Sequence, residues 1–303
     1  MTTSGLCAEV ECILHERNGL SFRRLRMGWL KRFLRQRLPG PYRRCYDVYH
    51  RMIDFVRFVS CLGRGKLCVF CGRASRRFLS HGLDSPVFRE KQIIGAGYRL
   101  NAGCPFCGCL DRERHVYLYL KEKTEIFAKP LRMLHVAPEA NLGRLLRQHS
   151  NIDYLSADLD PTVAMIRMDL MDIEFPENTF DAIICNHVLE HVPDDRRGMA
   201  ELFRVLKPGG WAILQVPISL ALEMTFEDPR VTSPAERERL FGQNDHVRLH
   251  GRDYERRLQH AGFAVELYRY VDERGEEAAD RYCLIGQERL YIGRKLPPAV
   301  SAN

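Results

Sequence analysis

The sequence has no long hydrophobic run. An apolar stretch such as WAILQVPISLAL (211–222) is interrupted by Gln215 and Pro217, and no segment approaches the 18 apolar residues that indicate a membrane-spanning helix. The N-terminus, MTTSGLCAEVEC, lacks the basic region followed by an apolar region that marks a secretory signal. We therefore expect a globular protein without a transmembrane segment, located in the cytoplasm.

Acidic residues are scarce between residues 17 and 51. This segment holds eleven Arg and Lys against one acidic residue, whereas the rest of the chain holds 35 basic and 38 acidic residues, so the net charge of +7 belongs to the segment. Apolar residues recur there at helical spacing on both sides of Pro39–Gly40–Pro41. We expect residues 1–60 to form a basic helical arm. Its basic face is solvated, or binds an anionic membrane surface or a nucleic acid.

Cysteines are more abundant, and eleven of them in a cytoplasmic chain favour metal binding or burial over disulfides. Residues 67–72 (LCVFCG) and 103–108 (GCPFCG) both contain Cys-x-x-Cys-Gly, a turn that aims two sulfurs at one point. The sequence predicts a zinc-ribbon domain over 61–115 with a structural Zn²⁺, or an iron in a rubredoxin-like site. The predicted ligands are Cys68, Cys71, Cys104 and Cys107. Cys61 and Cys109 are surplus to this set and are expected to pack.

After a predicted linking helix at 116–127, within a helical pattern over 112–127, short apolar runs alternate with helical patterns. This alternation is typical of an α/β fold with a parallel sheet covered by helices. Strands are predicted near 131–136, 152–158, 165–168, 180–186, 210–217, 263–270 and 287–293. Helices are predicted near 139–149, 194–206 and 251–261. Residues 128–303 are expected to form this domain, with an insertion at 218–250.

Glycine is missing from the turn after the first of these strands. Dinucleotide-binding proteins and methyltransferases place glycine there, so that the backbone can approach a ligand. Here the turn holds Ala137, Pro138 and Glu139. Asp158 ends the next strand nineteen residues after Glu139, at about the distance where an acidic residue binds ribose hydroxyls in nucleotide-binding units. The turn therefore raises the question of an altered binding site.

Two further segments, FPENTFDAIICNHVLEHV (175–192) and RVLKPGG (204–210), together with Asp169, complete a recognisable series. The series resembles the class I S-adenosylmethionine-dependent methyltransferases over roughly residues 128–220. The resemblance implies a Rossmann-like, seven-stranded sheet with helices on both faces and S-adenosylmethionine as cofactor. It also implies that Asp158 holds the ribose, that Asp169 lies beside the adenine, and that Asn186 and His187 lie near the methyl group.

The chain departs from this family in two places. The usual Asp/Glu-x-Gly-x-Gly-x-Gly becomes His135, Ala137, Glu139 and Asn141. Glu139 either binds the amino group of the cofactor or caps its own helix, where its charge suits the helix dipole. Only ten residues separate Asp158 from Asp169, so the helix between those strands must shrink to about one turn, which leaves the adenine side open.

The segment HVLEH (187–191) matches a zinc-protease motif, but it directly follows a strand within a run that methyltransferases share. We interpret it as part of the methyltransferase site. We expect this segment to be helical, so that His187 and His191, four residues apart, share one face. His187 is the better candidate for a general base, and His191 is more often a structural histidine.

The insertion at 218–250 is long enough to be a lid or a binding element. We expect it to bind the methyl acceptor. His246 is a candidate base, Arg248 a candidate clamp for a carboxylate or phosphate, and Asp245 and His250 further contacts.

Three functions fit these observations. The first is methyl transfer to a small-molecule or sugar-type acceptor, at oxygen and with a histidine base. The second is methylation of RNA, with the zinc ribbon and the basic arm at 17–51 as binding surfaces. The third is a non-catalytic interaction protein with a degenerate cofactor site.

Overall fold

The computed structural model of the chain describes residues 48, 52, 55–56 and 58–298. The chain divides into two compact units, residues 1–59 and residues 60–303. The predicted basic arm at 1–60, including the charged segment 17–51, lies almost wholly outside the described residues. The description below therefore concerns the second unit.

Seven strands form the central sheet, in the order β14-β15-β10-β9-β6-β7-β8. Strands β6, β7, β8, β9 and β10 are parallel, and β15 runs antiparallel to its neighbours β10 and β14. Every strand predicted between 131 and 293 is confirmed within a few residues. The observed strands are β6 (Leu131–Val136), β7 (Ile152–Asp158), β8 (Ile166–Arg167), β9 (Phe180–Cys185), β10 (Leu206–Ile213), β14 (Ala264–Tyr268) and β15 (Leu290–Arg294).

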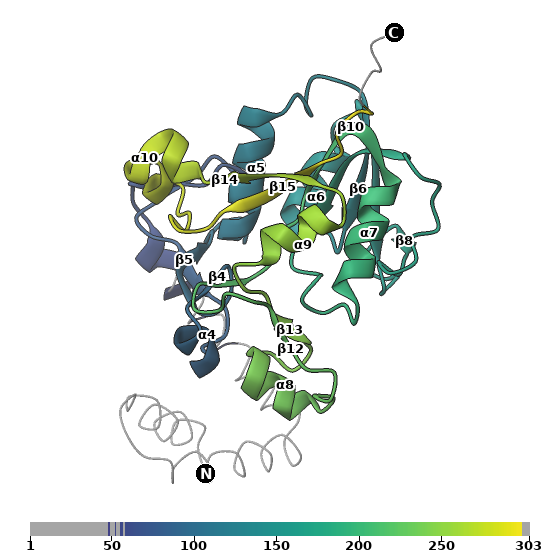
Figure 1. Ribbon diagram of the computed structural model, residues 1–303. Coiled ribbons are helices and arrows are strands. Elements are labelled where there is room, and N and C mark those ends of the chain that lie inside the picture. Colours follow the sequence, from purple (N-terminus) through teal and green to yellow (C-terminus); the bar gives the residue numbers. More distant parts are fainter. Residues whose placement is uncertain (1–47, 49–51, 53–54, 57, 299–303) are drawn as a thin grey trace, which may run out of the picture. The chain divides into compact units, whose positions relative to one another are not determined.

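Both faces of the sheet are buried, because alternate strand residues enter two separate cores. Leu134 belongs to the core beneath α7 (Asp195–Val205) and α9 (Tyr254–His260). Its neighbour Met133 belongs to the core beneath α5 (Asp111–Lys123), α6 (Ala140–Arg147) and α10 (Tyr270–Arg281). Figure 1 shows α7 and α9 on the near face of the sheet and α5 on the far face. The predicted three-layer α/β architecture is therefore present.

The crossover between β7 and β8 is as short as the sequence predicts. Residues 161–163 form a turn instead of a helix, and the Asp160 carboxylate accepts hydrogen bonds from the amide and the hydroxyl of Thr162. The sequence did not predict α10. Within it, Gly275 has φ 81° and ψ 166°, so the helical path is broken at that residue, which obscures the helical pattern.

The cysteine-rich segment is built from short elements. Two two-stranded ribbons, β1 (Lys66–Leu67) with β2 (Ala74–Ser75) and β3 (Leu79–His81) with β5 (Arg99–Gly103), carry the two Cys-x-x-Cys turns. Between β3 and β5, α4 (Pro86–Glu90) and β4 (Ile93–Ile94) extend toward the insertion. The segment therefore contacts more of the molecule than a separate ribbon domain would.

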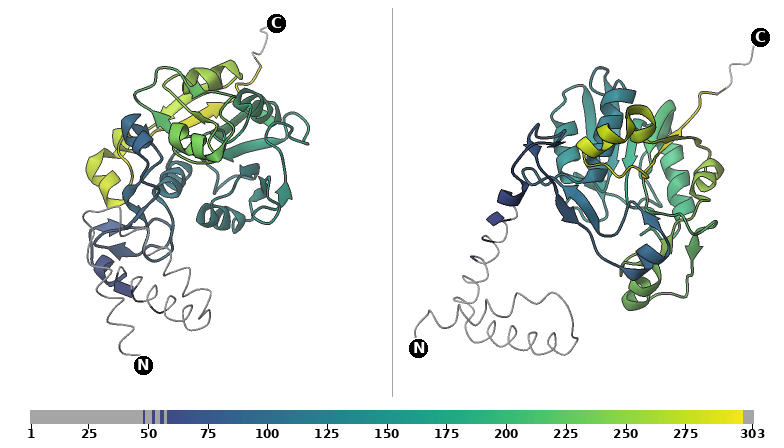
Figure 2. Two further views of the ribbon diagram at one scale, coloured as in Figure 1. Left: turned by 90° about the horizontal axis from the view of Figure 1, so that it is seen from below. Right: turned by 90° about the vertical axis from the view of Figure 1, so that its left-hand side faces the viewer.

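The insertion at 218–250 is folded. It contains β11 (Ile218–Ser219), β12 (Phe226–Glu227), α8 (Pro234–Phe241) and β13 (Arg248–Leu249). Strand β11 pairs with β4, and Phe241 and Leu249 share a small core with Phe88. In the right-hand view of Figure 2, α4 and α8 lie side by side. The insertion and residues 86–94 thus form one layer beside the carboxyl end of the sheet.

Arg114 ties the cysteine-rich segment to the C-terminal part of the sheet domain. Its guanidinium is fully buried and donates hydrogen bonds to the carbonyl oxygens of Asn101, Cys109, Tyr282 and Cys283 at 2.8–3.3 Å. The guanidinium also stacks over the Phe78 ring, 4.8 Å from its centroid. A buried cation with four carbonyl acceptors fixes the two segments together.

Among the helices that the described residues form, none has the length and apolar character needed to cross a bilayer.

His115 generates a prediction about acid stability. It is 1% exposed, its ring nitrogens have no hydrogen-bond partner within the described part of the chain, and burial lowers its pKa to about 4. Between pH 6.5 and pH 4, the His115 imidazole is therefore protonated in the unfolded state but not in the folded state. The free energy of unfolding falls as the pH decreases through this range. Between about pH 8 and pH 5, the wild type should lose roughly 2 kcal/mol more unfolding free energy than His115→Phe.

Urea unfolding at the two pH values measures this difference. The variant His260→Phe, which changes an exposed histidine at the end of α9, should retain the full acid sensitivity. Equal pH dependence of His115→Phe and the wild type would show that His115 does not carry it.

Candidate cofactor and acceptor site

The turn after β6 adopts a glycine-like conformation without glycine. Ala137 has φ 47°, in the left-handed region that residues other than glycine seldom adopt. Its amide donates a hydrogen bond to the carbonyl oxygen of Ala157 at 2.8 Å. The methyl group of alanine adds little bulk beside this backbone. The backbone of this turn therefore has the conformation that a glycine would favour at the same position.

Glu139, the N-cap of α6, turns its carboxylate away from its own helix. Among residues 58–298 its side chain makes no capping hydrogen bond. Instead, Oε2 lies 2.8 Å from Nε2 of His135, and Oε1 accepts a hydrogen bond from Nδ2 of Asn186 at 3.1 Å. The carboxylate thus joins the end of β6, the start of α6 and the residue after β9. Of the two interpretations of Glu139, helix capping by its side chain is wrong.

Two further groups orient His135. The Tyr154 hydroxyl lies 3.0 Å from its Nδ1, while its Nε2 contacts Glu139. Gly143 in α6 makes room for this contact, because a Cβ there would lie 2.9 Å from the tyrosine oxygen. Burial raises the pKa of Glu139, but the hydrogen bond and charge of His135 outweigh it and lower the pKa to about 2. The site therefore presents a fixed negative charge.

The other predicted cofactor residues lie at or just after the carboxyl ends of the strands. Asp158 ends β7 and accepts the amide of Asp160 at 2.9 Å. Asp169 is exposed and accepts the amide of Met171 at 2.8 Å. Asn141, in the first turn of α6, contacts Arg144. The structure places Ala137, Asp158 and Asn186 at one edge of the sheet, as the parallel strands require.

Asn186 supplies the observation that tests whether this edge fits S-adenosylmethionine. It is 5% exposed, and its Oδ1 has no hydrogen-bond partner among the described residues. A buried carbonyl oxygen beside an ionised carboxylate suits the cationic end of the cofactor, where an ammonium and a sulfonium group lie. Backbone in a left-handed turn and a strand-end aspartate complete a donor set that fits this molecule.

The prediction that HVLEH is helical is wrong. His187 has φ 55°, its amide donates to the carbonyl oxygen of Gln215 at 2.7 Å, and residues 189–191 form a turn. Helix α7 begins only at Asp195, where the Asp194 side chain accepts the amide of Arg197. The left-handed backbone of His187 prevents a continuous helix here, so the zinc-protease geometry is absent from this part of the described chain.

Instead of facing His187, His191 faces the insertion. Its ring packs against that of His246 with the centroids 4.7 Å apart, and its Nδ1 lies 3.3 Å from the Asp245 carboxylate. His246 is 2% exposed and its Nδ1 lies 3.2 Å from the Phe241 carbonyl oxygen. Burial lowers the pKa of His246, which keeps it neutral at physiological pH. Three of the predicted acceptor-side residues are thus in contact.

Arg248 and His250 are buried beneath this contact. The Arg248 guanidinium donates to Glu227 at 2.9 Å and to the carbonyl oxygens of Leu189, Val192 and Pro193. These acceptors engage all three of its nitrogen atoms, and the predicted clamp for a substrate anion stays a prediction. His250 is fully buried against Tyr254, and burial lowers its pKa to about 3.

Glu190 was not among the residues predicted from the sequence. This residue is 2% exposed, one oxygen lies 3.4 Å from Nδ1 of His187, and the other has no partner among the described residues. Burial raises its pKa, but the surrounding imidazoles, first of all His187, lower it to about 2. The signal was the HVLEH motif itself, which places a carboxylate between two histidines.

The cysteine turns bring five thiols together. Each turn is closed by a glycine with positive φ, 68° at Gly72 and 74° at Gly108. The sulfurs of Cys68 and Cys107 are 3.6 Å apart and those of Cys71 and Cys104 are 3.8 Å apart, as the predicted ligand set requires. The set whose sulfurs all lie within 4.8 Å of one another nevertheless contains Cys109 in place of Cys71. Cys109 therefore lies at the site instead of serving only as packing.

The chemistry of these thiols fits a divalent metal. Hydrogen bonds from Cys109 and Cys68 lower the pKa of Cys104, and the same contacts raise the pKa values of Cys68 and Cys109. One thiolate in the group thus makes ionisation of the neighbouring thiols less favourable. A bound cation would compensate the negative charges and allow all of its ligands to ionise. The sulfur separations of 3.3–3.8 Å are close to the ~3.8 Å edge of a tetrahedron with zinc–sulfur bonds of about 2.3 Å.

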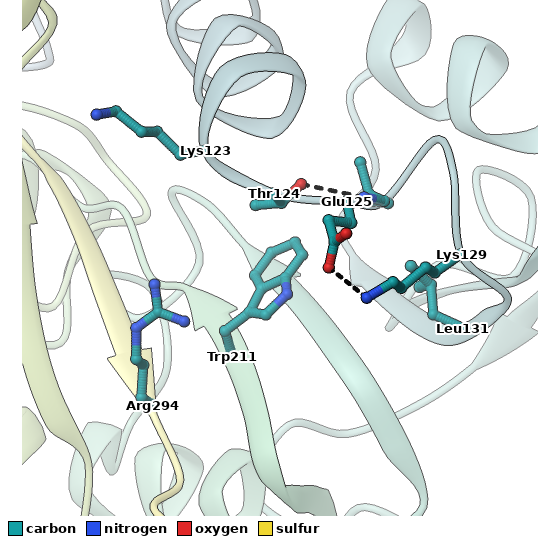
Figure 3. A pocket seen from close by; sticks show the side chains of 8 residues that line it. Lys123, Thr124, Glu125, Lys129, Leu131, Trp211 and Arg294 are labelled. Atoms are coloured by element: carbon teal, nitrogen blue, oxygen red, sulfur yellow. Dashed lines mark hydrogen bonds and ion pairs between the residues drawn. The ribbon is translucent and has the colours of Figure 1, made fainter.

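Two hollows lie in different parts of the described chain. One, of about 510 Å³, lies between the insertion and residues 83–98 and is lined by residues that include Leu83, Phe88, Ile93, Tyr98 and Leu220. The Phe88 ring also faces that of His246, with centroids 6.4 Å apart. The other, of about 290 Å³, lies toward the amino ends of the parallel strands. Figure 3 shows Trp211 there between Arg294 and the Glu125–Lys129 ion pair.

Replacing Glu139 tests the central role of its carboxylate. Glu139→Gln removes the charge that His135 contacts and should lower the free energy of unfolding at pH 7 by about 2 kcal/mol, because hydrogen bonds to charged groups contribute about 1.5–3 kcal/mol. Glu177→Gln, at an exposed position, is the matched control. Equal denaturant midpoints for the two variants would contradict the assignment.

Comparison with known proteins agrees with this geometry. Residues 128–214 match the family model described as a methyltransferase domain. An uncharacterized methyltransferase of Schizosaccharomyces pombe is 28% identical over 130 residues, 41% of this chain and 44% of that protein. The sterol 24-C-methyltransferase of Aspergillus fumigatus is 40% identical over 126 residues, 37% of this chain and 33% of that protein. The chain thus spans less than half the length of these relatives.

Solved structures with a similar arrangement include the [4+2]-cyclase SpnF, with a TM-score of 0.43, 16% identity and coverage of 61% of this chain and 82% of that chain. A SAM-dependent methyltransferase from Archaeoglobus fulgidus has a TM-score of 0.40 and 14% identity, covering 60% of this chain and 94% of that chain. Residues 128–214 are thus similar to a methyltransferase domain, and they lie within the seven-stranded sheet.

Proposed function

We propose that the chain transfers a methyl group from S-adenosylmethionine to a small-molecule acceptor. The observation that supports this most strongly is the buried Glu139–Asn186 pair at the carboxyl edge of a methyltransferase sheet, with an unshared amide oxygen beside a fixed negative charge. Relatives named for sterols and for methyl-phytyl hydroquinones favour small acceptors over macromolecules.

In this proposal, Asp158 accepts hydrogen bonds from the ribose and Asp169 lies beside the adenine. Glu139 and Asn186 receive the cationic end of the cofactor, and His135 holds Glu139 in place through its contact at 2.8 Å. Ala137 gives the backbone its close approach. S-adenosylmethionine, when bound, supplies a methyl group on a positively charged sulfur that leaves as a neutral thioether.

The acceptor is an oxygen nucleophile in this proposal. Its O–H bond breaks as its oxygen bonds to the methyl carbon and the carbon–sulfur bond breaks, and the proton passes to a histidine. His187 is suited to this role, because it directly follows Asn186 and its Nε2 has no partner in the described part of the chain. Alignment of the acceptor oxygen with the sulfur supplies much of the acceleration.

The hollow of about 510 Å³ beside the insertion is the proposed acceptor site. Its lining mixes apolar side chains such as Leu83, Phe88 and Leu220 with polar ones, and the Phe88 ring faces that of His246 in the insertion. The insertion is fixed to residues 86–94 through the β4–β11 pair, so it forms a wall of this site.

The cofactor proposal is tested by calorimetric titration with S-adenosylmethionine. Asp158→Ala should weaken binding roughly 10–100-fold, because a hydrogen bond to a charged group is worth about 1.5–3 kcal/mol. Asp153→Ala changes an exposed aspartate at the other end of the same strand and should bind like the wild type. Equal affinity of both variants, or failure of the folded wild type to bind, would contradict the proposal.

We further propose that the thiol cluster holds a structural Zn²⁺ ion. Cys104→Ser should release about one metal equivalent and unfold the cysteine-rich segment, because metal binding supplies folding free energy there. Cys61→Ser, at a buried cysteine of the same segment outside the mutually close set, should keep the metal. Metal content measured by mass spectrometry decides, and an unchanged content in Cys104→Ser would refute the site.

A further inference from the structure

Three side chains beside the proposed acceptor site form a second cluster of metal-ligating groups. The potential ligand atoms of Glu190, His191 and His246 all lie within 4.8 Å of one another. Glu190 and His191 follow β9, whereas His246 belongs to the insertion. The Val247 amide donates to the Glu190 carbonyl oxygen at 3.0 Å and fixes the two segments together. The cluster is separate from the thiols of the cysteine-rich segment.

Each member has an atom left for a ligand. His246 places Nδ1 at 3.2 Å from the Phe241 carbonyl oxygen, so its Nε2 remains. One Glu190 oxygen faces His187, and the other is buried with no partner among the described residues. The His191 side chain is 33% exposed, and its Nδ1 lies 3.3 Å from Asp245. The cluster therefore reaches from the interior to solvent.

Hydrogen bonds among the described residues leave one oxygen of the Glu190 carboxylate without a partner. A carboxylate oxygen that is 98% or more removed from solvent and lacks a partner costs free energy. The neighbouring imidazoles do not satisfy it, because Nδ1 of His246 is directed at the Phe241 carbonyl oxygen and His187 contacts the other carboxylate oxygen. A cation placed between the three side chains satisfies the oxygen and both imidazoles.

We infer that Glu190, His191 and His246 bind a divalent transition-metal ion such as Zn²⁺. Two imidazoles and one carboxylate are a ligand set that such ions accept, whereas Mg²⁺ and Ca²⁺ prefer oxygen ligands. Three protein ligands would leave at least one coordination position open to a further ligand, and His191 is partly exposed to solvent. This is the pattern of a reactive metal site, in contrast to the four-thiol site.

This inference rests on the proposed function and gives it a substrate class. A hydroxylated acceptor would bind the open position through its oxygen, and the metal would lower the pKa of that hydroxyl. His191 and His246 then act as ligands, and His187 remains to take the proton. The acceptor class is thus a small molecule with an acidic hydroxyl group, such as a phenol or an enol.

The experiment titrates the full-length protein with Co²⁺ after dialysis against a chelator. Thiolate-bound Co²⁺ has strong sulfur-to-metal charge-transfer absorption, and a histidine–carboxylate site lacks it, so the two sites are read separately. His191→Ala, at a partly exposed position, should bind about one equivalent less than the wild type. Affinity at this site should fall at least about 100-fold, since loss of an outer-shell partner alone costs 10–100-fold. His260→Ala, an exposed histidine elsewhere, is the matched control.

Glu190→Gln, checked for folding by circular dichroism, should show the same loss while the thiolate absorption stays unchanged. The inference is overturned if the wild type binds metal only at its thiols, or if His191→Ala and Glu190→Gln bind as much as the wild type. Calorimetry with S-adenosylmethionine separates the two proposals. Intact cofactor binding without the second metal overturns this inference alone, whereas loss of cofactor binding with the second metal present overturns the proposed function.

Discussion

The largely buried carboxylate of Glu139 determines how the elements of the candidate cofactor site meet. An ionised group can remain in the interior only with charge-assisted partners, and this one takes them from His135 at the end of β6 and Asn186 after β9. Satisfying Glu139 therefore fixes the turn at 137–139, the start of α6 and the exit of β9 in one geometry. The tyrosine beside His135 and the glycine that admits it extend the same constraint into the next strand.

A second carboxylate, Glu190, joins this edge of the sheet to the insertion. Its backbone pairs with Val247, and its side chain lies among imidazoles from both segments. Beneath it, Arg248 reaches four acceptors, and Asp195 receives Arg257 at 3.0 Å. The cysteine-rich segment completes the wall through Phe88 and the β4–β11 pair. Segments far apart in the sequence thus meet beside one hollow, which is the proposed acceptor site.

Much of this arrangement follows from local sequence patterns. The alternating apolar runs predicted all seven strands, since each buried strand leaves a pattern that does not depend on its partners. The Cys-x-x-Cys-Gly repeats predicted the two thiol turns, because their glycines need positive φ. The short crossover after Asp158 followed from counting residues. The resemblance to class I methyltransferases supplied Asp158, Asp169 and Asn186, whose common location at the strand ends the structure then provides.

Features that depend on distant contacts were not predictable. The left-handed backbone of His187 is stabilised by a hydrogen bond to Gln215, which is invisible in HVLEH alone, so a helix was predicted there. Cys109 joins the thiol set only because the two ribbons fold together. The direction of the Glu139 carboxylate depends on Asn186, 47 positions away. Similarly, the contact of His191 with His246 needs the insertion to fold back over the strand ends.

Glu139 is proposed to face the cofactor, and a crystal structure with S-adenosylhomocysteine tests that claim directly. We predict the ribose hydroxyls at Asp158 and the amino group of the ligand within hydrogen-bond distance of Glu139 or the Asn186 amide oxygen. A ligand bound at another edge of the sheet, or one whose amino group contacts neither residue, would contradict it. Glu139 would then be a structural bridge alone.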